Sequence, residues 1–364
     1  MGPFIHQKPE WPQLTWDDAA LAKPLMAARM HQSHFLGRMQ GLGFQVQQEA
    51  ELTNMTLEVV KSSEIEGEIL APDQVRSSIA RRLGLDVAGL IAPERQVEGV
   101  VELMIDATRN SAEPLTSARL FRWHSSLFAG GAEGLTIGAW REGPMQVISG
   151  PMGRPKVHFE APEAERVAEE MKAFLKWENA SEGIDPVLKA GLAHLWFVTV
   201  HPFDDGNGRI ARAISELELT RAERGAQRFY SQSAQIRAER KDYYDILERT
   251  QRGPLDVTEW LEWYLGCLDR AIATAEASLG TVLRRDLFWR THAGKAVNER
   301  QRLLLNMLID GFTGKLKSSK WATIAKCSQP TAIRDIEELI GFGILVQDPG
   351  GGRSTSYSLA PFGA

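Results

Sequence analysis

The chain has 364 residues, of which 43% are hydrophobic and 24% charged, and its formal net charge is −5 at pH 7. These values are typical of a soluble globular protein with room for two or three domains, and the charge gives no general attraction to nucleic acid or anionic membranes. The sequence has no apolar stretch of membrane-spanning length and no basic segment followed by an apolar run at its start. Its two cysteines, Cys267 and Cys327, match no metal-binding spacing, so we expect a reducing, cytoplasmic location with no membrane partner.

Residues 1–110 are predicted to form an N-terminal helical domain. Apolar residues at helical spacing predict helices over residues 25–42, 44–63, 73–83 and 95–109, and the preceding segment 11–17 is expected to pack on these helices as a cap. At the end of the second helix, Ser62 and Glu66 are four residues apart and project from one face, and Gly67 can stop the helix. Taken alone, this segment is typical of a helix end with solvated acids.

Residues 111–275 are predicted to form a second helical domain that contains one β-hairpin. Apolar alternation on both sides of a Gly/Pro turn predicts the hairpin over residues 145–159. Helices are predicted over residues 192–201 and 260–268. The predicted fold class is therefore mainly α, with a β-hairpin in the central domain.

The most informative stretch is residues 201–212, which read HPFDDGNGRIAR. His201 can be neutral near pH 7 and accept the proton of an attacking hydroxyl, and Asp205 offers the oxygen ligand that Mg²⁺ prefers. Gly206 and Gly208 lack a Cβ, so their backbone can approach a phosphate closely with its N–H groups turned inward. These parts together indicate transfer of a phosphorus centre from a nucleotide to a hydroxyl.

A helix is predicted to start at the end of this loop, and a helix N-terminus after a Gly-Asn-Gly turn is suited to bind an anion. Arg209 and Arg212 lie three residues apart on one face of that helix, where their planar guanidinium groups can bind anionic oxygens. Phe203 is expected to anchor the loop in the core. The alternative is a polar loop with a buried, satisfied histidine, which is disfavoured because all the parts occur together at this spacing.

Residues 276–364 are predicted to form a winged-helix-like domain. Helices are predicted over residues 321–326 and 331–340, with Ser328 as the N-cap of the second and an apolar face formed by Ile333, Ile336, Leu339 and Ile340. Two strands are predicted over residues 341–345 and 353–357, with a glycine-rich wing at residues 350–352 between them.

The second helix of such a domain can enter the major groove of DNA, and its candidate contacts are Thr331, Arg334 and Arg353. The same helix carries acidic residues that weaken its attraction to DNA, namely Asp335, Glu337 and Glu338. Winged helices also dimerise and dock proteins, so DNA binding and protein binding are both left open.

The motif HPFDDGNGRIAR resembles the signature of the Fic domain proteins at every position, and these proteins mostly transfer AMP from ATP to a Ser, Thr or Tyr hydroxyl. The resemblance implies that His201 is the general base, that Asp205 carries Mg²⁺ and that pyrophosphate leaves. It also implies an anion hole formed by Gly206, Asn207 and Gly208, and β- and γ-phosphates held by Arg209 and Arg212. Segments such as residues 60–68 and 228–231 extend the likeness over most of the chain.

The same resemblance implies a function for Ser62, Glu66 and Gly67 that these residues do not indicate on their own. They are similar to the inhibitory motif of the family, in which the glutamate pairs with the second motif arginine, here Arg212. That pairing keeps the γ-phosphate out of its productive position. The implied architecture is a Fic-type helical core with the inhibitory helix on its N-terminal side.

In the family, the matching hairpin is a flap that pairs with the target protein by strand addition. The candidate target contacts are Val147, Lys156, Val157 and His158. Tyr243 would contact the adenine and Gln251 would hydrogen-bond the nucleotide, and these two with Phe203 complete the predicted ATP-binding residues.

The sequence thus predicts a protein adenylyltransferase that uses Mg²⁺ and ATP and is autoinhibited by a Glu66–Arg212 pair. Its expected substrate is a hydroxyl of an unidentified target protein or of the chain itself, and a homodimer is left open. One alternative is AMP removal or another nucleotidyl transfer on the same scaffold. Another is a nucleotide-sensing transcription regulator that acts through the C-terminal domain.

Overall fold

The computed structural model describes residues 4–85, 90–149, 156–180, 183–225, 227–309, 311–312, 314–349 and 355–362. The chain is mainly helical, as predicted. It divides into two compact units, Met1–Ala275 and Glu276–Ala364. The predicted boundary near residue 110, which falls within the first unit, stays a prediction.

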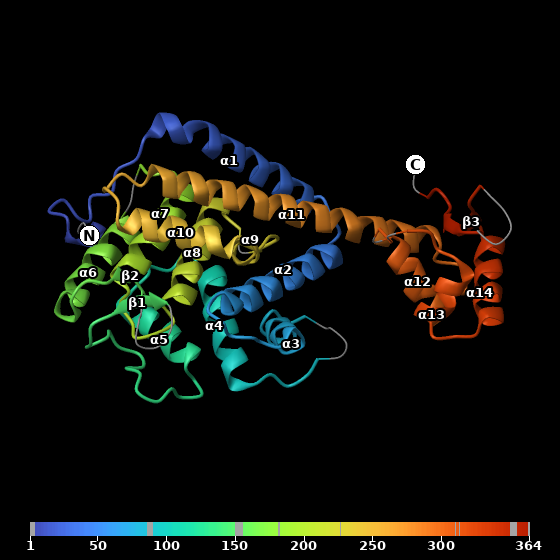
Figure 1. Ribbon diagram of the computed structural model, residues 1–364, viewed down its shortest axis with the longest axis horizontal. Helices are drawn as coiled ribbons and strands as arrows, with labels where there is room; N and C mark the ends of the chain where they lie inside the picture. Colours follow the sequence, from blue (N-terminus) through green and yellow to red (C-terminus); the bar gives the residue numbers. More distant parts are fainter. Residues whose placement is uncertain are drawn as a thin grey trace. The chain divides into compact units, whose positions relative to one another are not determined.

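The first unit is a helical body with one hairpin (Figure 1). In chain order its elements are the 3-10 helix η1 (Ile5–Gln7), α1 (Asp18–Gln40), α2 (Phe44–Ile65), α3 (Pro72–Arg82), α4 (Arg95–Arg109), α5 (Ser117–Leu127), β1 (Gln146–Ser149), β2 (Lys156–Glu160), α6 (Ala164–Ala180), α7 (Pro186–Val200), α8 (Asn207–Glu223), α9 (Gln232–Ala238), α10 (Arg240–Gln251) and the start of α11 (Thr258–Thr291).

Helices α7 and α8 form the centre of this unit. Every residue of α7 from Ala190 to Val200 is buried, so this helix is surrounded by protein. It begins before the predicted start at residue 192 because Asp185 accepts a hydrogen bond from the amide of Val187 and Pro186 fits the first turn. The C-terminal end of α7 delivers the motif loop, and α8 begins directly after that loop.

Helix α2 is held against the start of α9 by buried polar contacts. Glu58 accepts hydrogen bonds from the hydroxyl of Ser231, at 2.7 Å, and from the amide of Ser233, at 2.9 Å, where α9 begins. These bonds fix α2 one turn before Ser62 and two turns before Glu66. Helix α1 starts earlier than predicted, at Asp18, because the preceding Asp17 caps it.

The prediction that residues 11–17 cap the N-terminal helices is wrong. Trp11 instead packs edge-on against Trp196 of α7 and donates a hydrogen bond to Glu170 of α6 at 2.8 Å. Further along, Thr15 bridges to the segment before α11 at Asp256. Aromatic residues next to a polar segment indicated packing, but the sequence could not show which surface would receive them.

The predicted hairpin is present, with β1 antiparallel to β2 and a register shift between Val147 and Ile148. Its turn, residues 150–155, lies outside the described residues. The hairpin base packs on the start of the chain, where Phe159 and Ala161 form a small apolar cluster with Phe4.

The second unit contains α12 (Glu299–Ile309), α13 (Ser318–Ile324), α14 (Gln329–Gly341), β3 (Leu345–Gln347) and β4 (Tyr357–Leu359). Strands β3 and β4 are antiparallel, and Leu316 adds a bridge to Tyr357. The order helix, bridge, helix, helix, strand, strand is that of a winged helix. Its own core is built around Phe288, Trp321 and Leu339.

Two details of this unit differ from the prediction. Ile333 and Ile340 were expected on the apolar face of α14, but they are 40% and 38% exposed, and the buried face has Ala332 and Asp335 beside Ile336 and Leu339. The strands begin later than predicted because α14 extends to Gly341 and a turn with Gly343 at φ +68 follows it. Ser328 caps α14 as predicted, whereas the wing tip and Arg353 lie outside the described residues.

Among the described residues, none of the helices combines the length and the apolar character needed to cross a membrane.

Candidate active site

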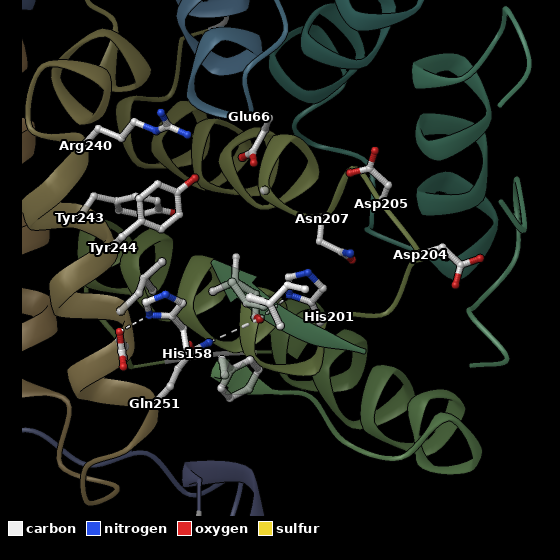
Figure 2. A pocket seen from close by; sticks show the side chains of 17 residues that line it. Glu66, His158, His201, Asp204, Asp205, Asn207, Arg240, Tyr243, Tyr244 and Gln251 are labelled. Carbon is white, nitrogen blue, oxygen red and sulfur yellow. Dashed lines mark hydrogen bonds and ion pairs between the residues drawn. The ribbon is translucent and has the colours of Figure 1, made fainter. Parts of the chain in front are cut away.

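A cavity of about 480 Å³ lies in the first unit, between the motif loop, the hairpin and α10. Figure 2 shows Tyr243, Tyr244 and Gln251 on one side of it and His201, Asn207 and Asp205 on the other. The complete lining is Glu66, Val147, Ile148, His158, Phe159, Val198, His201, Asp204, Asp205, Asn207, Gly208, Arg240, Tyr243, Tyr244, Leu247, Glu248 and Gln251. The structure therefore brings together predicted residues that lie far apart in the sequence.

His201 stands at the C-terminal end of α7 in a left-handed conformation, with φ 51°. Its Nδ1 lies 3.0 Å from the carbonyl oxygen of Val198. Since a carbonyl only accepts, Nδ1 carries the proton and Nε2 is left as the acceptor. Burial lowers the pKa of His201, and the charge of Arg141 lowers it further, so the ring is neutral at pH 7.

Arg141 is a buried residue of the site that sequence reasoning missed. Its Nε donates to the carbonyl of His201 at 2.8 Å, its Nη1 to that of Gly143 at 2.8 Å, and its Nη2 to that of Pro162 at 2.6 Å. One side chain therefore fixes the backbone of the histidine and the segment that leads into the hairpin. No local sequence pattern marks an arginine that binds carbonyls so distant in the sequence.

The loop after His201 is closed by its own side chains. Asn207 accepts a hydrogen bond from the amide of Phe203 at 3.0 Å and donates one to its carbonyl at 2.8 Å. The Phe203 ring is fully buried and stacks on His124 at 4.2 Å, so its side chain anchors the loop and is not part of the cavity wall. Gly206 has φ +80, a conformation that favours glycine, directly before α8.

Arg212, on α8, is paired with the end of α2. Its Nη1 lies 2.8 Å from Oε1 of Glu66, its Nε donates to the Ser62 hydroxyl at 2.9 Å, and its Nη2 donates to the Ser62 carbonyl at 2.8 Å. Gly67 follows with φ +88 and ends the helix, as predicted from its lack of a Cβ. The three residues Ser62, Glu66 and Gly67 therefore meet the second motif arginine.

The glutamate also fills the space beside the motif helix. A Cβ built on Gly208 would lie 2.0 Å from Oε1 of Glu66. A carboxylate oxygen of Glu66 thus lies next to the backbone of Gly208.

Arg209 has an acidic partner of its own that the sequence prediction did not assign. Its Nη1 lies 2.6 Å from Oε2 of Glu68, and its Nη2 lies 3.7 Å from Asp205. Glu68 also accepts a hydrogen bond from Gln96 at 2.6 Å. Both arginines predicted to hold phosphates are therefore paired with carboxylates from the segment that ends α2.

Asp205 fits a metal ion whose other ligands come from a nucleotide. One oxygen accepts the amide of Gly206 at 2.6 Å, and the side chain is 58% exposed beside the cavity. Within the described part of the chain, no group of three or more His, Cys, Asp or Glu side chains could hold a metal. A single carboxylate with hard oxygens is the donor set expected for Mg²⁺ that stays bound to phosphates and water.

The two tyrosines of α10 have different environments. Tyr243 is 3% exposed and its hydroxyl lies 2.9 Å from Nε2 of His194, whose pKa burial lowers to about 3. Tyr244 is 37% exposed, with the guanidinium of Arg240 5.5 Å from its ring centre. Tyr244 and Arg240 therefore offer accessible cavity wall that the sequence prediction did not include.

Gln251 is buried at the end of α10. It donates to Thr199 at 3.3 Å and to the carbonyl of Val198 at 3.5 Å. It thereby links α10 to the end of α7 and lines the cavity as predicted.

The hairpin is tied to α10 by charged contacts. His158 and Lys156 approach the carboxylate of Glu248 at 2.5 Å and 3.6 Å, and Arg252 donates to the carbonyl of Val157 at 2.8 Å. Of the four predicted flap residues, Val147 and His158 line the cavity, while Lys156 and Val157 do not. The exposed Ile148 of β1 lines it as well.

Comparison with known families gives two matches along the chain. Residues 114–219, which contain the hairpin and the whole motif loop, match the Fic/DOC family. This region of the chain is a Fic/DOC family domain. Residues 4–85, which contain α2 and the Glu66 segment, match a domain of unknown function (DUF4172).

Similar proteins were found by sequence and by structure. "Protein adenylyltransferase Fic" of Culex quinquefasciatus is 30% identical over 138 residues, which is 36% of this chain and 25% of that protein. "Protein adenylyltransferase fic-1" of Caenorhabditis elegans is 43% identical over 60 residues, 16% of this chain and 12% of that protein. The chain thus spans about a quarter or less of the length of these curated relatives.

The structural likeness covers more of the chain. A Fic family protein from Desulfovibrio desulfuricans superposes with a TM-score of 0.55 at 20% identity, over 97% of this chain and 100% of that one. A Fic domain-containing signalling protein from Bacteroides thetaiotaomicron gives 0.53 at 19% identity, over 70% of this chain and 96% of that one. At these identities the likeness establishes the Fic fold.

Proposed function

We propose that this Fic family chain is a protein adenylyltransferase, which transfers AMP from ATP to a protein hydroxyl and is held inactive by Glu66. The observation that carries the proposal is the meeting of His201, the motif loop and Arg212 at one cavity, with Glu66 bound to Arg212 at 2.8 Å. The curated relatives named protein adenylyltransferase support the same reaction.

His201 is assigned as the general base. Its Nδ1 is committed to Val198, so Nε2 accepts the proton of the attacking hydroxyl as the oxygen attacks the α-phosphorus. The bond between the α-phosphorus and the bridging oxygen breaks, and pyrophosphate leaves. Arg141 keeps the ring in place because it holds the carbonyl of the same residue.

The start of α8 is assigned to bind the negatively charged phosphates. The backbone N–H groups at Asn207 and Gly208 are assigned to the phosphate oxygens, together with that of Gly206 once it is released from Asp205, to which it donates at 2.6 Å. Arg209 and Arg212 are assigned to the β- and γ-phosphates. Mg²⁺ held by Asp205 would neutralise phosphate charge when bound.

The nucleoside is assigned to the α10 side of the cavity. Gln251 and the Tyr243–Tyr244 pair form that wall, and Tyr244 has the more accessible ring. Aromatic surface suits a purine base because stacking needs no particular hydrogen-bond pattern.

The inhibited state follows from the position of Glu66. Its carboxylate neutralises Arg212, and its Oε1 lies 2.0 Å from the position of a Cβ built on Gly208, so a γ-phosphate would not bind there at the same time. Productive ATP binding therefore requires Glu66 to leave Arg212.

The hairpin is assigned as the docking site for the target. Because Arg252 and Glu248 tie β2 to α10, β1 is the strand to which an extended target segment would add. Val147, Lys156, Val157 and His158 remain the candidate contacts, and such pairing uses backbone groups, which is compatible with more than one target sequence.

The test compares wild type, Glu66→Gly, and Glu66→Gly combined with His201→Ala. Each is incubated with Mg²⁺ and ATP labelled at the α- or the γ-phosphate, with and without cell extract. Label from the α-position on the Glu66→Gly protein or on extract proteins, lost in the double variant, is the expected result. Label from the γ-position alone would show kinase chemistry, and no label despite ATP binding would favour a nucleotide sensor.

A further inference from the structure

The two units of the chain carry opposite net charges. Residues 276–364 contain twelve Lys and Arg against eight Asp and Glu, whereas the whole chain has 42 against 47. The first 275 residues therefore hold thirty basic against thirty-nine acidic residues. The whole-chain charge of −5 conceals a C-terminal unit that is basic, and basic domains favour polyanionic partners.

The fold of this unit presents α14 as a recognition helix (Figure 1). Helices α13 and α14 pack together, and Gln329 at the start of α14 donates to Ser318 at the start of α13 at 2.9 Å. In helix-turn-helix proteins, the second helix lies in the major groove and its N-terminal residues contact base edges. Here the N-terminal half of α14 exposes Gln329, Ile333 and Arg334.

The structure removes one of the three acidic residues that counted against DNA from the exposed surface of α14 and ties a second to α12. Asp335 is 2% exposed and accepts two hydrogen bonds from Arg300, at 2.9 and 3.0 Å. Glu338 accepts a hydrogen bond from Gln301 of α12 at 2.8 Å. Glu337 and Glu338 are both exposed and lie three and four residues after Arg334, one turn further along the helix.

Basic side chains flank this half of the helix. Lys326 is exposed in the turn before α14, and Lys317, directly before α13, is half-buried. Lys320 is exposed on α13 and also contacts the ring of Phe312. In a helix-turn-helix complex the first helix and the turn face the DNA backbone, so these lysines are placed for phosphates and Arg334 for a base.

We infer that the C-terminal unit binds duplex DNA, with the N-terminal half of α14 in the major groove. Arg334 donates to a base edge, with guanine as the favoured partner, and the exposed Ile333 packs against a thymine methyl group. Lys326 and Lys317 bind phosphates. Glu337 opposes the contact because its charge faces the same groove. This function is independent of the AMP transfer proposed for the first unit.

The experiment measures the affinity of the full-length protein for fluorescent 30-base-pair duplexes by anisotropy, from 50 to 200 mM salt. One probe has random sequence, and a second is selected from a random pool by the wild-type protein. Three variants are compared with wild type: Lys326→Gln with Arg334→Gln, Glu337→Gln, and the control Lys172→Gln with Lys176→Gln. The control removes the same charge from the exposed face of α6 in the first unit.

The expected result is DNA binding that weakens with salt and falls about ten- to a hundredfold in the Lys326/Arg334 variant, with a salt slope lower by about 1. Glu337→Gln should bind at least twofold tighter, an effect that loss of folding cannot produce. Equal binding by the α6 control and the Lys326/Arg334 variant would overturn the proposal. An absence of DNA binding at 50 mM salt would also overturn it. If the protein then self-associates and Ile333→Ser abolishes that self-association, the surface is assigned to a protein partner.

Discussion

The two arginines of the motif helix are each paired with a carboxylate from the segment after α2, and these pairs can be removed one at a time. Glu66→Gly frees Arg212, and Glu68→Gln frees Arg209 from its partner at 2.6 Å. We expect each change to raise the rate of AMP transfer, because each arginine becomes available to a phosphate.

The magnitudes differ because the environments differ. Arg212 is 2% exposed and Glu66 is 30% exposed, so their pair is partly buried. A charge-assisted hydrogen bond contributes about 1.5–3 kcal/mol net, which corresponds to a rate increase of about 10- to 150-fold for Glu66→Gly. Arg209 keeps Asp205 at 3.7 Å after Glu68→Gln, so we expect about 0.5–1 kcal/mol, or two- to fivefold.

The assay is incorporation of label from α-labelled ATP into the protein and into extract, with ATP affinity measured in parallel by calorimetry. The double variant completes a mutant cycle that reports whether the two pairs act independently. The matched control is Glu64→Gly, which removes a carboxylate from the same helix end but one that pairs with Lys61 and Arg237.

Two results would refute this reasoning. One is a Glu66→Gly protein that folds and binds ATP but transfers AMP no faster than wild type. The other is equal activation by Glu64→Gly, which would mean that loosening the end of α2, not freeing Arg212, raises activity.

Further outcomes follow from the same contacts. In the Glu66→Gly background, His201→Ala should lower the rate of AMP transfer about 10²- to 10⁴-fold. ATP affinity, measured by calorimetry, should be retained. Labelling at the normal rate would exclude His201 as the base. Because the pKa of His201 is lowered and the base must be neutral, the rate should stay constant as pH falls through 6.5 and decline only below it. Arg141→Ala should lower the free energy of unfolding in urea by about 2–4 kcal/mol, since buried carbonyls lose their donor, and an unchanged midpoint would contradict this. Burial raises the pKa of Glu178 to about 7, above its unfolded value. The folded state therefore binds the proton more tightly, and the free energy of unfolding falls as pH rises from about 4.5 to 7. Glu178→Gln should flatten that decline when thermal unfolding is measured across this pH range.

The sequence predicted best what lies close together in the chain. The loop from His201 to Arg212 is contiguous, so its parts could be recognised by spacing, and Ser62 and Glu66 share a helix face for the same reason. The mainly helical class was confirmed as well, because apolar spacing marks amphipathic helices.

What the sequence missed depends on tertiary contacts. Arg141 binds carbonyls from three segments, and Glu68 reaches Arg209 across 141 positions of sequence. Neither contact has a local pattern, because an arginine or glutamate on a loop is usually solvated. Trp11 packs on α7 for a similar reason, since its apolar surface indicated burial without naming the partner.

The acidic residues of α14 show the same limit in another form. Asp335 was predicted to weaken the attraction of α14 to DNA, but it lies on the buried face and is neutralised by Arg300. Helical periodicity alone did not show that Asp335 is buried and Ile333 exposed. The buried face of this helix contains an ion pair in place of one apolar residue.

In the proposed inhibited state, the ion pair between Glu66 and Arg212 makes the inhibitor a part of the same molecule as the site it blocks. A tethered carboxylate has an effective concentration at Arg212, on the order of millimolar or more, that does not change when the protein is diluted. ATP must therefore compete with a ligand that never diffuses away, and raising the nucleotide level alone is an inefficient way to start the reaction. A partner that shifts the last turn of α2 by a small distance lowers that effective concentration for every chain it binds. The proposed control would respond to the presence of a binding partner more than to the concentration of ATP.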